Sequence, residues 1–381
     1  MVEIQDAQLY NLREIYRDPT GKTLIYFGDY DQRPGYPSTP VAVKVINCHG
    51  MIEPYVYIEE CINQRRIPSV NVCQIYGWSI KPDKVMIVME RMDKDLAKEI
   101  TERRERGYKY FSQEDLLTIC AQVVDIFAQM QRMQLSHNDI KAENIFLSKD
   151  SSGNITYKVG DFGSASTNRG LEHSLTGTPL YLSPILKREY QHFNSSQTKR
   201  DIHHDPVKSD VFSLGVTLLY AAKLRQPDDL IDMTMLQAKL DQHISDVSQI
   251  AGEKGLMYPG IAAMLPGMLQ VDESRRCDFI QLQQWLQQYY PAIAQPTAYF
   301  ATIKSQPTAK PPSSSPIDQE NLVTLNDSIV QNDWETTTLI LELFYGRKKQ
   351  LLWQAVCPHT TPYCNRAVCC ENCNQGRFQS S

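Results

Sequence analysis

The chain has 381 residues, of which 42% are hydrophobic and 22% are charged, close to the average for globular proteins. This length suits one large domain or two ordinary ones, each with a buried core. The net charge of −5 argues against a nucleic-acid partner held on a basic face, because binding phosphates needs clustered Lys and Arg. The apolar runs are too short to span a membrane and the first residues lack a signal-peptide pattern, so we expect neither feature.

The ten cysteines form two groups. One group is scattered through apolar surroundings, as buried reduced thiols usually are, and contains Cys48, Cys61, Cys73, Cys120 and Cys277. Such usage is typical of a reducing compartment, so we expect a cytoplasmic protein. The other five cysteines lie between Cys357 and Cys373.

The first part of the chain has the pattern of a small antiparallel sheet. Residues 24–28 and 41–46 are short β-branched and aromatic runs, separated by the turn-rich residues 29–40. Residues 52–65 have helical spacing, and residues 72–77 and 85–89 return to strand-like runs. The sequence therefore predicts a sheet accompanied by one helix.

The following part is mainly helical. Ser112 is a predicted N-cap, with Asp115 three residues on, for a helix that extends to about Met133. Residues 145–147 and 155–159 flank a turn and predict a hairpin. Helical periodicity continues over residues 207–220 and 237–289, so the fold class is α+β.

The C-terminal part changes composition. Residues 291–316 are rich in Pro and Ser and predict a flexible linker. Residues 317–381 form a tail, in which an apolar stretch could make a helix that docks on the main domain or on a protein partner. Its Cys-rich end holds one CxxC pair and could bind zinc, with a disordered or reversibly oxidised tail as the alternative.

A compact polar cluster lies in residues 135–147. Asp139 can orient a hydroxyl, Lys141 can hold a phosphate, and the amide oxygen of Asn144 can bind a hard cation such as Mg2+. The same residue types also occur on ordinary solvated loops. The chemistry of this cluster therefore depends on what accompanies it in the chain.

Several distant motifs accompany the cluster in a fixed order. They are Val41-Ala-Val-Lys44, a Glu on the next helix, His137-Asn-Asp-Ile-Lys-Ala-Glu-Asn144, Asp161-Phe-Gly163, Gly177-Thr-Pro-Leu-Tyr-Leu-Ser-Pro184 and Asp210-Val-Phe-Ser-Leu-Gly215. With these motifs the chain resembles the protein kinase family over about residues 10–290. The resemblance implies a two-lobed fold, with an N-lobe at about 10–90 and a larger, mainly helical C-lobe at about 93–290.

The resemblance also implies roles for the polar residues. Lys44 would bind the α and β phosphates of ATP and pair with Glu60, which the spacing to Asn71 favours over Glu59. Asp161 and Asn144 would hold Mg2+. Asp139 would orient the hydroxyl of a protein substrate, and Lys141 would lie beside the transferring phosphoryl group.

The adenine site follows from the same resemblance. The ring would lie between Ala42 and Phe146, with Met89 as gatekeeper and the backbone of Glu90 and Met92 as hinge. Lys141 together with Gly177-Thr178 is similar to the Ser/Thr branch of the family.

The sequence departs from the family pattern at several positions. Only Gly21 remains in the glycine-rich phosphate loop, which should weaken nucleotide binding. Asn138 replaces the usual Arg before the catalytic Asp, so we expect a switch independent of an activation-loop phosphate. Ile185 replaces the Glu that normally pairs with an Arg, here Arg276, which we expect to be solvated or paired with another acid.

Two features have less defined roles. The hydroxyls that could be phosphorylated are Ser166, Thr167, Ser174 and Thr176. The segment of residues 186–208 is longer than the family needs and contains His192, His203 and His204, which we interpret as a solvated polar insertion rather than a metal site.

Three functions fit the sequence. The first is a Ser/Thr protein kinase that uses Mg-ATP. The second is a pseudokinase or scaffold that binds nucleotide weakly and recruits partners through its tail, as the degraded phosphate loop suggests. The third is a small-molecule phosphotransferase, which the peptide-platform motif at residues 177–184 disfavours.

Overall fold

The structure is a computed structural model of the chain. It describes residues 2–293 except 5–7, 32–36, 49–52, 82, 151–152, 168–174, 199–201 and 254–259. The predicted tail, its helix and cysteines, and nearly all of the predicted linker lie outside these residues, as does Ser174. The described part of the chain divides into two compact units, one with residues up to 59 and 76–89, the other with residues 60–75 and 90–293. The predicted domain limits stay predictions.

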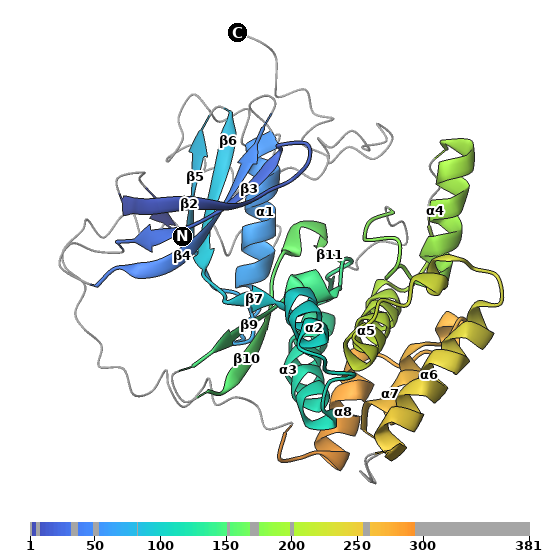
Figure 1. Cartoon of the computed structure of the whole chain (residues 1–381). Helices are drawn as coiled ribbons and strands as arrows, with labels where there is room; N and C mark the ends of the chain where they lie inside the picture. Colours follow the sequence, from blue (N-terminus) through green and yellow to red (C-terminus); the bar gives the residue numbers. More distant parts are fainter. Residues whose placement is uncertain are drawn as a thin grey trace. The chain divides into compact units, whose positions relative to one another are not determined.

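The first unit is built on a six-stranded sheet with the order β1-β5-β6-β4-β3-β2 (Figure 1). β2 pairs antiparallel with β3 and β3 with β4, whereas the short β1 lies parallel to β5. The strands are β1 (Val2–Glu3), β2 (Leu9–Arg17), β3 (Thr23–Tyr30), β4 (Thr39–Asn47), β5 (Ile75–Lys81) and β6 (Lys84–Glu90). The predicted antiparallel sheet is confirmed, and the parallel β1 is an addition to it.

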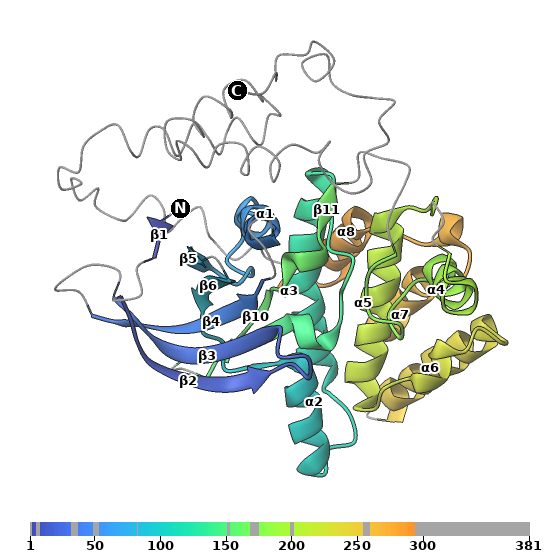
Figure 2. The same ribbon diagram turned by 90° about the horizontal axis from the view of Figure 1, so that it is seen from above.

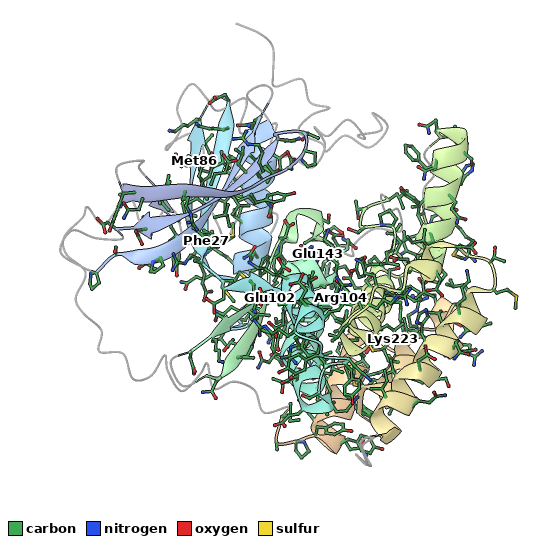
Figure 3. The ribbon with its side chains drawn as sticks, in the orientation of Figure 1. Phe27, Met86, Glu102, Arg104, Glu143 and Lys223 are labelled. Carbon is green, nitrogen blue, oxygen red and sulfur yellow. The ribbon has the colours of Figure 1, made fainter. Side chains whose placement is uncertain are left out.

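The core of this unit is formed by side chains that alternate with outward-facing ones along the strands. Val41 and Val43 on β4 are fully buried on one face, because residues two apart in a strand point the same way. The same cluster contains Ile4, Leu9, Tyr30, Met86 and Val88. Figure 3 labels Met86 and Phe27 on this sheet.

The second unit contains most of the helices. The helices of the chain are α1 (Glu53–Arg65), which contributes its residues from Glu60 onward, α2 (Leu96–Glu105), α3 (Gln113–Arg132), α4 (Pro184–Ser196), α5 (Pro206–Lys223), α6 (Leu236–Glu253), α7 (Gly260–Met268) and α8 (Phe279–Tyr289). Short 3-10 turns are η2 (Ala142–Asn144), η3 (Phe162–Ser164), η4 (Asp228–Ile231) and η5 (Glu273–Arg275). The predicted helical part is confirmed.

Short strands connect these helices. β9 (Ile145–Lys149) and β10 (Ile155–Val159) form the predicted hairpin, and β7 (Lys94–Asp95) pairs with β9 on its other side. β8 (Leu135–Ser136) pairs antiparallel with β11 (Ser166–Thr167). The β8–β11 pair therefore ties the segment after Asp161 to the start of the polar loop.

α3 and α5 lie side by side in the core of the second unit (Figures 1 and 2). In α5, 16 of 18 residues are buried, as expected for a central helix. α3 begins as predicted, since the Ser112 hydroxyl accepts a hydrogen bond of 3.0 Å from the Asp115 N–H. α2 was not predicted, because its sequence is mostly charged and only Leu96, Glu99 and Ile100 are buried.

The prediction for Arg276 is wrong. This side chain is 2% exposed, so it is not solvated. Its guanidinium donates to the carbonyl oxygens of Gln270 (3.0 and 2.8 Å) and Lys208 (2.8 Å), and it lies over the ring of Phe212. Carbonyl oxygens thus take the place of the missing carboxylate.

The segment of residues 186–208 begins within α4, which covers residues 186–196 of the segment. Leu186 and Lys187 are buried on that helix, and the described residues 188–198 are exposed or half-buried. Among the described helices, none combines the length and the apolar character needed to cross a membrane.

Candidate active site

The predicted loop residues form one hydrogen-bonded cluster around Asp139. Lys141 Nζ lies 2.6 Å from Asp139 Oδ2, and Thr178 Oγ1 donates to Asp139 Oδ1 at 2.8 Å. Lys141 Nζ also donates to Thr178 Oγ1 at 2.9 Å. Asn144 Nδ2 donates to the Asp139 carbonyl at 2.8 Å and to Oδ2 at 3.2 Å. Both carboxylate oxygens of Asp139 are therefore fixed in direction.

Asp210 on α5 fixes the backbone of this loop. Its two carboxylate oxygens accept hydrogen bonds from the N–H groups of His137 (2.7 Å) and Asn138 (2.8 Å). Burial raises the pKa of Asp210 to about 7, against the opposing effect of these two hydrogen bonds. The loop is thus anchored to the most buried helix of the unit.

His137 connects the loop to the Asp161-Phe-Gly turn. It is completely buried, and burial lowers its pKa, so the neutral ring donates from Nε2 to the Gly160 carbonyl at 3.2 Å. Its ring also packs on buried Phe162, with ring centres 4.9 Å apart. The Gly160 N–H donates to the Asn144 carbonyl at 3.1 Å. These contacts hold the two predicted metal-binding segments side by side.

Glu60 lies at the same turn. A Cβ atom built on Gly163 would lie 3.2 Å from Glu60 Oε2 and 3.5 Å from Asp161 Oδ1. Two carboxylates therefore converge beside this glycine, whose lack of a side chain allows the approach. Asp161 itself is exposed and has a left-handed backbone, with φ 57°.

Asn138 holds the segment that follows this turn. Its Nδ2 donates to the Ser164 carbonyl and to Ser166 Oγ, both at 2.9 Å. Asn138 has φ 63°, a left-handed conformation that Asn tolerates better than most residues. A neutral amide thus holds this segment at the position where the family pattern has an Arg.

Three predicted adenine-site residues lie in the second unit. Phe146 on β9 lies opposite Lys158 of β10 and Asp95 of β7 in the sheet register, and its ring lies against Gly160. The Glu90 N–H donates to the Gln74 carbonyl at 2.8 Å, so a ligand bond from the Glu90 backbone has to use its carbonyl. Met92 is buried.

The other predicted nucleotide residues lie in the first unit. Ala42 is buried on β4 opposite Phe27, and Lys44 is half-buried opposite Ile25. Met89 is half-buried on β6. Their predicted roles with residues of the second unit stay predictions.

The β2–β3 turn replaces a glycine-rich loop. Gly21 has φ 70°, and its N–H donates to the Asp18 carbonyl at 3.0 Å. Burial tends to raise the pKa of the Asp18 carboxyl, but hydrogen bonds from Thr20 and from the N–H groups of Thr23, Lys22 and Gly21 outweigh it and lower the pKa. Groups of the turn itself therefore accept from the N–H groups that a phosphate would need, since the Lys22 N–H also donates to Thr20 Oγ1 at 3.3 Å.

The protein kinase domain matches this chain over residues 36–290, about two thirds of its length. The chain belongs to the protein kinase family. The match includes the Asp139 cluster, Asp161 and Asp210, which the structure joins through the contacts described above.

Similar kinases come from distant organisms. The chain is 31% identical over 195 residues to serine/threonine-protein kinase Nek5 of Homo sapiens, covering 50% of this chain and 25% of Nek5. It is 31% identical over 183 residues to SAPK4 of Oryza sativa subsp. japonica, covering 47% of this chain and 45% of SAPK4. It is 26% identical over 257 residues to atg1 of Dictyostelium discoideum, covering 62% of this chain and 33% of atg1. The matched part thus spans less than half of each relative.

Three residues of the kinase site had no predicted role. Asp210 and His137 belong to motifs that the sequence displayed, but only the fold shows that one anchors and the other packs. Thr178 indicates the Ser/Thr branch in the sequence, and in the structure its hydroxyl bonds to both Asp139 and Lys141.

The histidines of the long segment in this kinase domain do not form a cluster. The His204 ring lies 2.8 Å from Ser209 Oγ, and His192 lies near Ser196. In the ranges that the structure describes, no group of three or more His, Cys, Asp or Glu side chains could hold a metal ion.

Proposed function

We propose that the chain is a serine/threonine protein kinase that transfers the γ-phosphate of Mg-ATP to a protein hydroxyl. The observation that carries this proposal is the Asp139 cluster, in which Lys141 and Thr178 fix the two carboxylate oxygens. Phosphoryl transfer depends mainly on positioning and on charge stabilisation, and this cluster supplies both.

Each residue of the cluster has a distinct task. Asp139 orients the attacking hydroxyl and accepts its proton as the new bond forms. Lys141 places a positive charge next to Asp139, where negative charge on the transferred group is stabilised. Asn144 holds Asp139 from the other side, since its Nδ2 donates to Asp139 Oδ2.

The donor set fits Mg2+. Asn144 turns its Nδ2 to Asp139, so its Oδ1 is the atom left to act as a ligand, and Asp161 offers an exposed carboxylate on the adjoining segment. Mg2+ prefers such oxygen ligands and is usually held by one or two carboxylates plus phosphates. When bound, Mg2+ would neutralise phosphate charge.

The residues that the kinase resemblance assigns to ATP keep those roles in this proposal. Lys44 would bind the α and β phosphates, and Glu60 would orient that Lys. Ala42, Phe146, Met89, Glu90 and Met92 would surround the adenine, with Gly21 near the phosphates. The convergence of the Glu60 and Asp161 carboxylates beside Gly163 supports a site that receives cationic groups.

The substrate would be a protein with a Ser or Thr hydroxyl, and no nucleic acid or membrane is invoked. A cytoplasmic location remains part of the proposal. Its support is the use of cysteine, since Cys73 and Cys120 are buried thiols in the core.

A pseudokinase is the second candidate, and the β2–β3 turn favours it. Because the Gly21 N–H donates to the Asp18 carbonyl and the Lys22 N–H to Thr20 Oγ1, nucleotide phosphates would have to displace these acceptors. Such a chain would bind ATP weakly and act through its partners.

The test is transfer of labelled γ-phosphate from ATP to a generic protein, by the full chain, with increasing Mg2+. We expect Mg2+-dependent labelling of Ser or Thr, and a loss of at least about 100-fold in Asp161→Asn. The matched control is Asp228→Asn, an exposed acid on η4. ATP-dependent thermal stabilisation without transfer in the wild type would favour the pseudokinase instead.

A further inference from the structure

A hollow lies apart from the Asp139 cluster. It has a volume of about 880 Å³ and is bounded by α2, the residues before α3, and the β9–β10 hairpin. None of the residues that line it belongs to the Asp139 cluster. The kinase function therefore leaves it unexplained.

The floor of the hollow is a network of ion pairs. Glu99 on α2 bonds to Lys94 on β7 (2.5 Å) and to Arg103 (2.6 Å), and Arg103 also bonds to Asp115 on α3 (2.8 Å). Lys94 further pairs with Glu102, which Figure 3 marks on α2. The acidic groups of the floor are thus neutralised by partners within it.

The rim of the hollow is basic. Five basic and three acidic side chains line the hollow, and with Glu102, which pairs with Lys94 and Arg106, one more positive than negative charge remains. The exposed cations of the lining are Arg106, which pairs with Glu102, and two at the rim: Lys109, before α3, and Lys149, at the end of β9. Within the described ranges neither Lys side chain forms an ion pair. Glu99 and Asp115 pair with other cations, and the Asp93 carboxylate accepts a hydrogen bond from the Lys149 backbone N–H at 2.8 Å.

Apolar and aromatic groups accompany these charges. Tyr108 is 58% exposed at the rim, and Leu147 and Ile155 contribute apolar surface from the hairpin. A matching occupant would combine carboxylates with aliphatic or aromatic side chains.

The chain itself contains such a segment. Residues 317–335 include five acidic side chains and no Lys or Arg, interleaved with apolar residues. The acids are Asp318, Glu320, Asp327, Asp333 and Glu335.

The fold brings the chain to the hollow just before this segment. α8 runs antiparallel to α3, from Phe279 beside Gln131 to Tyr290 near the start of α3 (Figure 1). The Tyr290 hydroxyl accepts a hydrogen bond from the Gly260 N–H, and Gly260 lies against Gln113, the first residue of α3. The neighbouring Ser112 lines the hollow.

The reach of the intervening chain is ample. From Ile293 to Ile317 there are 24 residues, and a flexible chain of that length has a root-mean-square span of about 25–30 Å. Such a tether gives an effective concentration on the order of millimolar, so weak contacts are sufficient for occupancy.

We propose that residues 317–335 dock intramolecularly in this hollow, with their carboxylates on Lys109 and Lys149 and their apolar side chains on Tyr108 and the β9–β10 hairpin. The docking does not depend on the proposed phosphotransfer. It gives this kinase domain a site for its own acidic segment.

The test is zero-length carbodiimide cross-linking of the full chain, which joins a carboxylate to a touching amine, followed by mass spectrometry. We expect Lys149 to be joined to acids of residues 317–335. In the Lys109→Glu variant Lys149 is still present. We expect the yield of cross-links between Lys149 and residues 317–335 to fall at least about 5-fold, because one rim charge is reversed. The control Lys98→Glu, on the exposed side of α2, should leave the yield unchanged.

Two results would overturn the proposal. One is an equal yield of tail cross-links at Lys98 and at Lys149, which would mean that the segment has no preferred site. The other is found by mixing isotopically light and heavy chains before cross-linking. Products that join a light chain to a heavy one would show that the occupant comes from a second copy.

Discussion

Two buried basic side chains flank the ring of Phe212 on α5. Lys187 Nζ lies 5.4 Å from the ring centre and the Arg276 guanidinium 5.2 Å, and each side chain is 2% exposed. Lys187 donates to the Leu230 carbonyl at 2.8 Å. Both basic groups are therefore contacted by backbone carbonyls and an aromatic face.

Lys187 should make stability depend on pH. Burial lowers its pKa to about 7, so the unfolded chain binds more protons than the native state between about pH 7 and pH 10. The free energy of unfolding should then rise with pH in this range. In Lys187→Met we expect that rise to be smaller by about 1–3 kcal/mol.

Urea unfolding at pH 7, 8 and 9 measures this difference, with the exposed Lys98→Met as control. Equal pH dependence in Lys187→Met and the wild type would contradict a neutralised buried Lys. The Leu230 carbonyl loses its donor in the variant, which shifts the stability at every pH but not its slope.

Spacing in the sequence predicted the groups of the proposed site but not the residues that hold them in place. Asp139, Lys141 and Asn144 lie within six residues, so their proximity was predictable from the sequence. Asp210 lies about 70 residues further along, and its anchoring role required the fold to bring α5 under the loop. Arg276 was mispredicted because backbone carbonyls leave no signal in a sequence.

At the scale of elements, the segment after Asp161 is held without a phosphate. Asn138 makes two hydrogen bonds to it, and β11 pairs with β8. We expect phosphatase treatment to change the rate of phosphate transfer less than about 2-fold, because a neutral Asn138 stands where the family pattern has the Arg that receives an activation-loop phosphate. A loss of activity that returns on rephosphorylation would contradict this.

The hydrogen bonds of Asn138 can be separated from its backbone conformation. Asn138→Ala should destabilise the chain by about 2 kcal/mol, since it loses both bonds and places Ala at a left-handed φ. Asn138→Gly should cost less, because Gly accepts that φ. Urea midpoints measure both, and equal effects would show that the conformation carries no strain.

The N-cap of α3 can be tested in the same way. Ser112→Ala should lower the unfolding free energy by about 1 kcal/mol, since the Asp115 N–H loses its acceptor. Ser112→Asp keeps a hydrogen-bond acceptor and should retain most of the unfolding free energy that Ser112→Ala loses. Thermal unfolding measures both variants, and an unchanged midpoint in Ser112→Ala would show that water replaces the cap.

Elements with clear periodicity were predictable, and charged ones were not. The 20 residues of α3 and the β9–β10 hairpin match their predicted positions closely. α2 is stabilised by ion pairs such as Arg103 with Glu99 rather than by a broad apolar face, so its pattern gave no signal.

At the scale of the whole molecule, each unit holds a different part of the proposed chemistry. The sheet unit has Lys44 and the altered β2–β3 turn, and the helical unit has the Asp139 cluster and Asp161. Membership of the protein kinase family follows from the match over residues 36–290. Catalysis by the Asp139 cluster is the central claim.

The measurement that tests this claim most directly is the turnover number for phosphate transfer to Ser or Thr in Asp139→Asn, alongside its dissociation constant for ATP. We predict a fall of about 100-fold or more in turnover, because the oriented carboxylate is lost, with ATP affinity unchanged. A turnover equal to that of the wild type would contradict the claim.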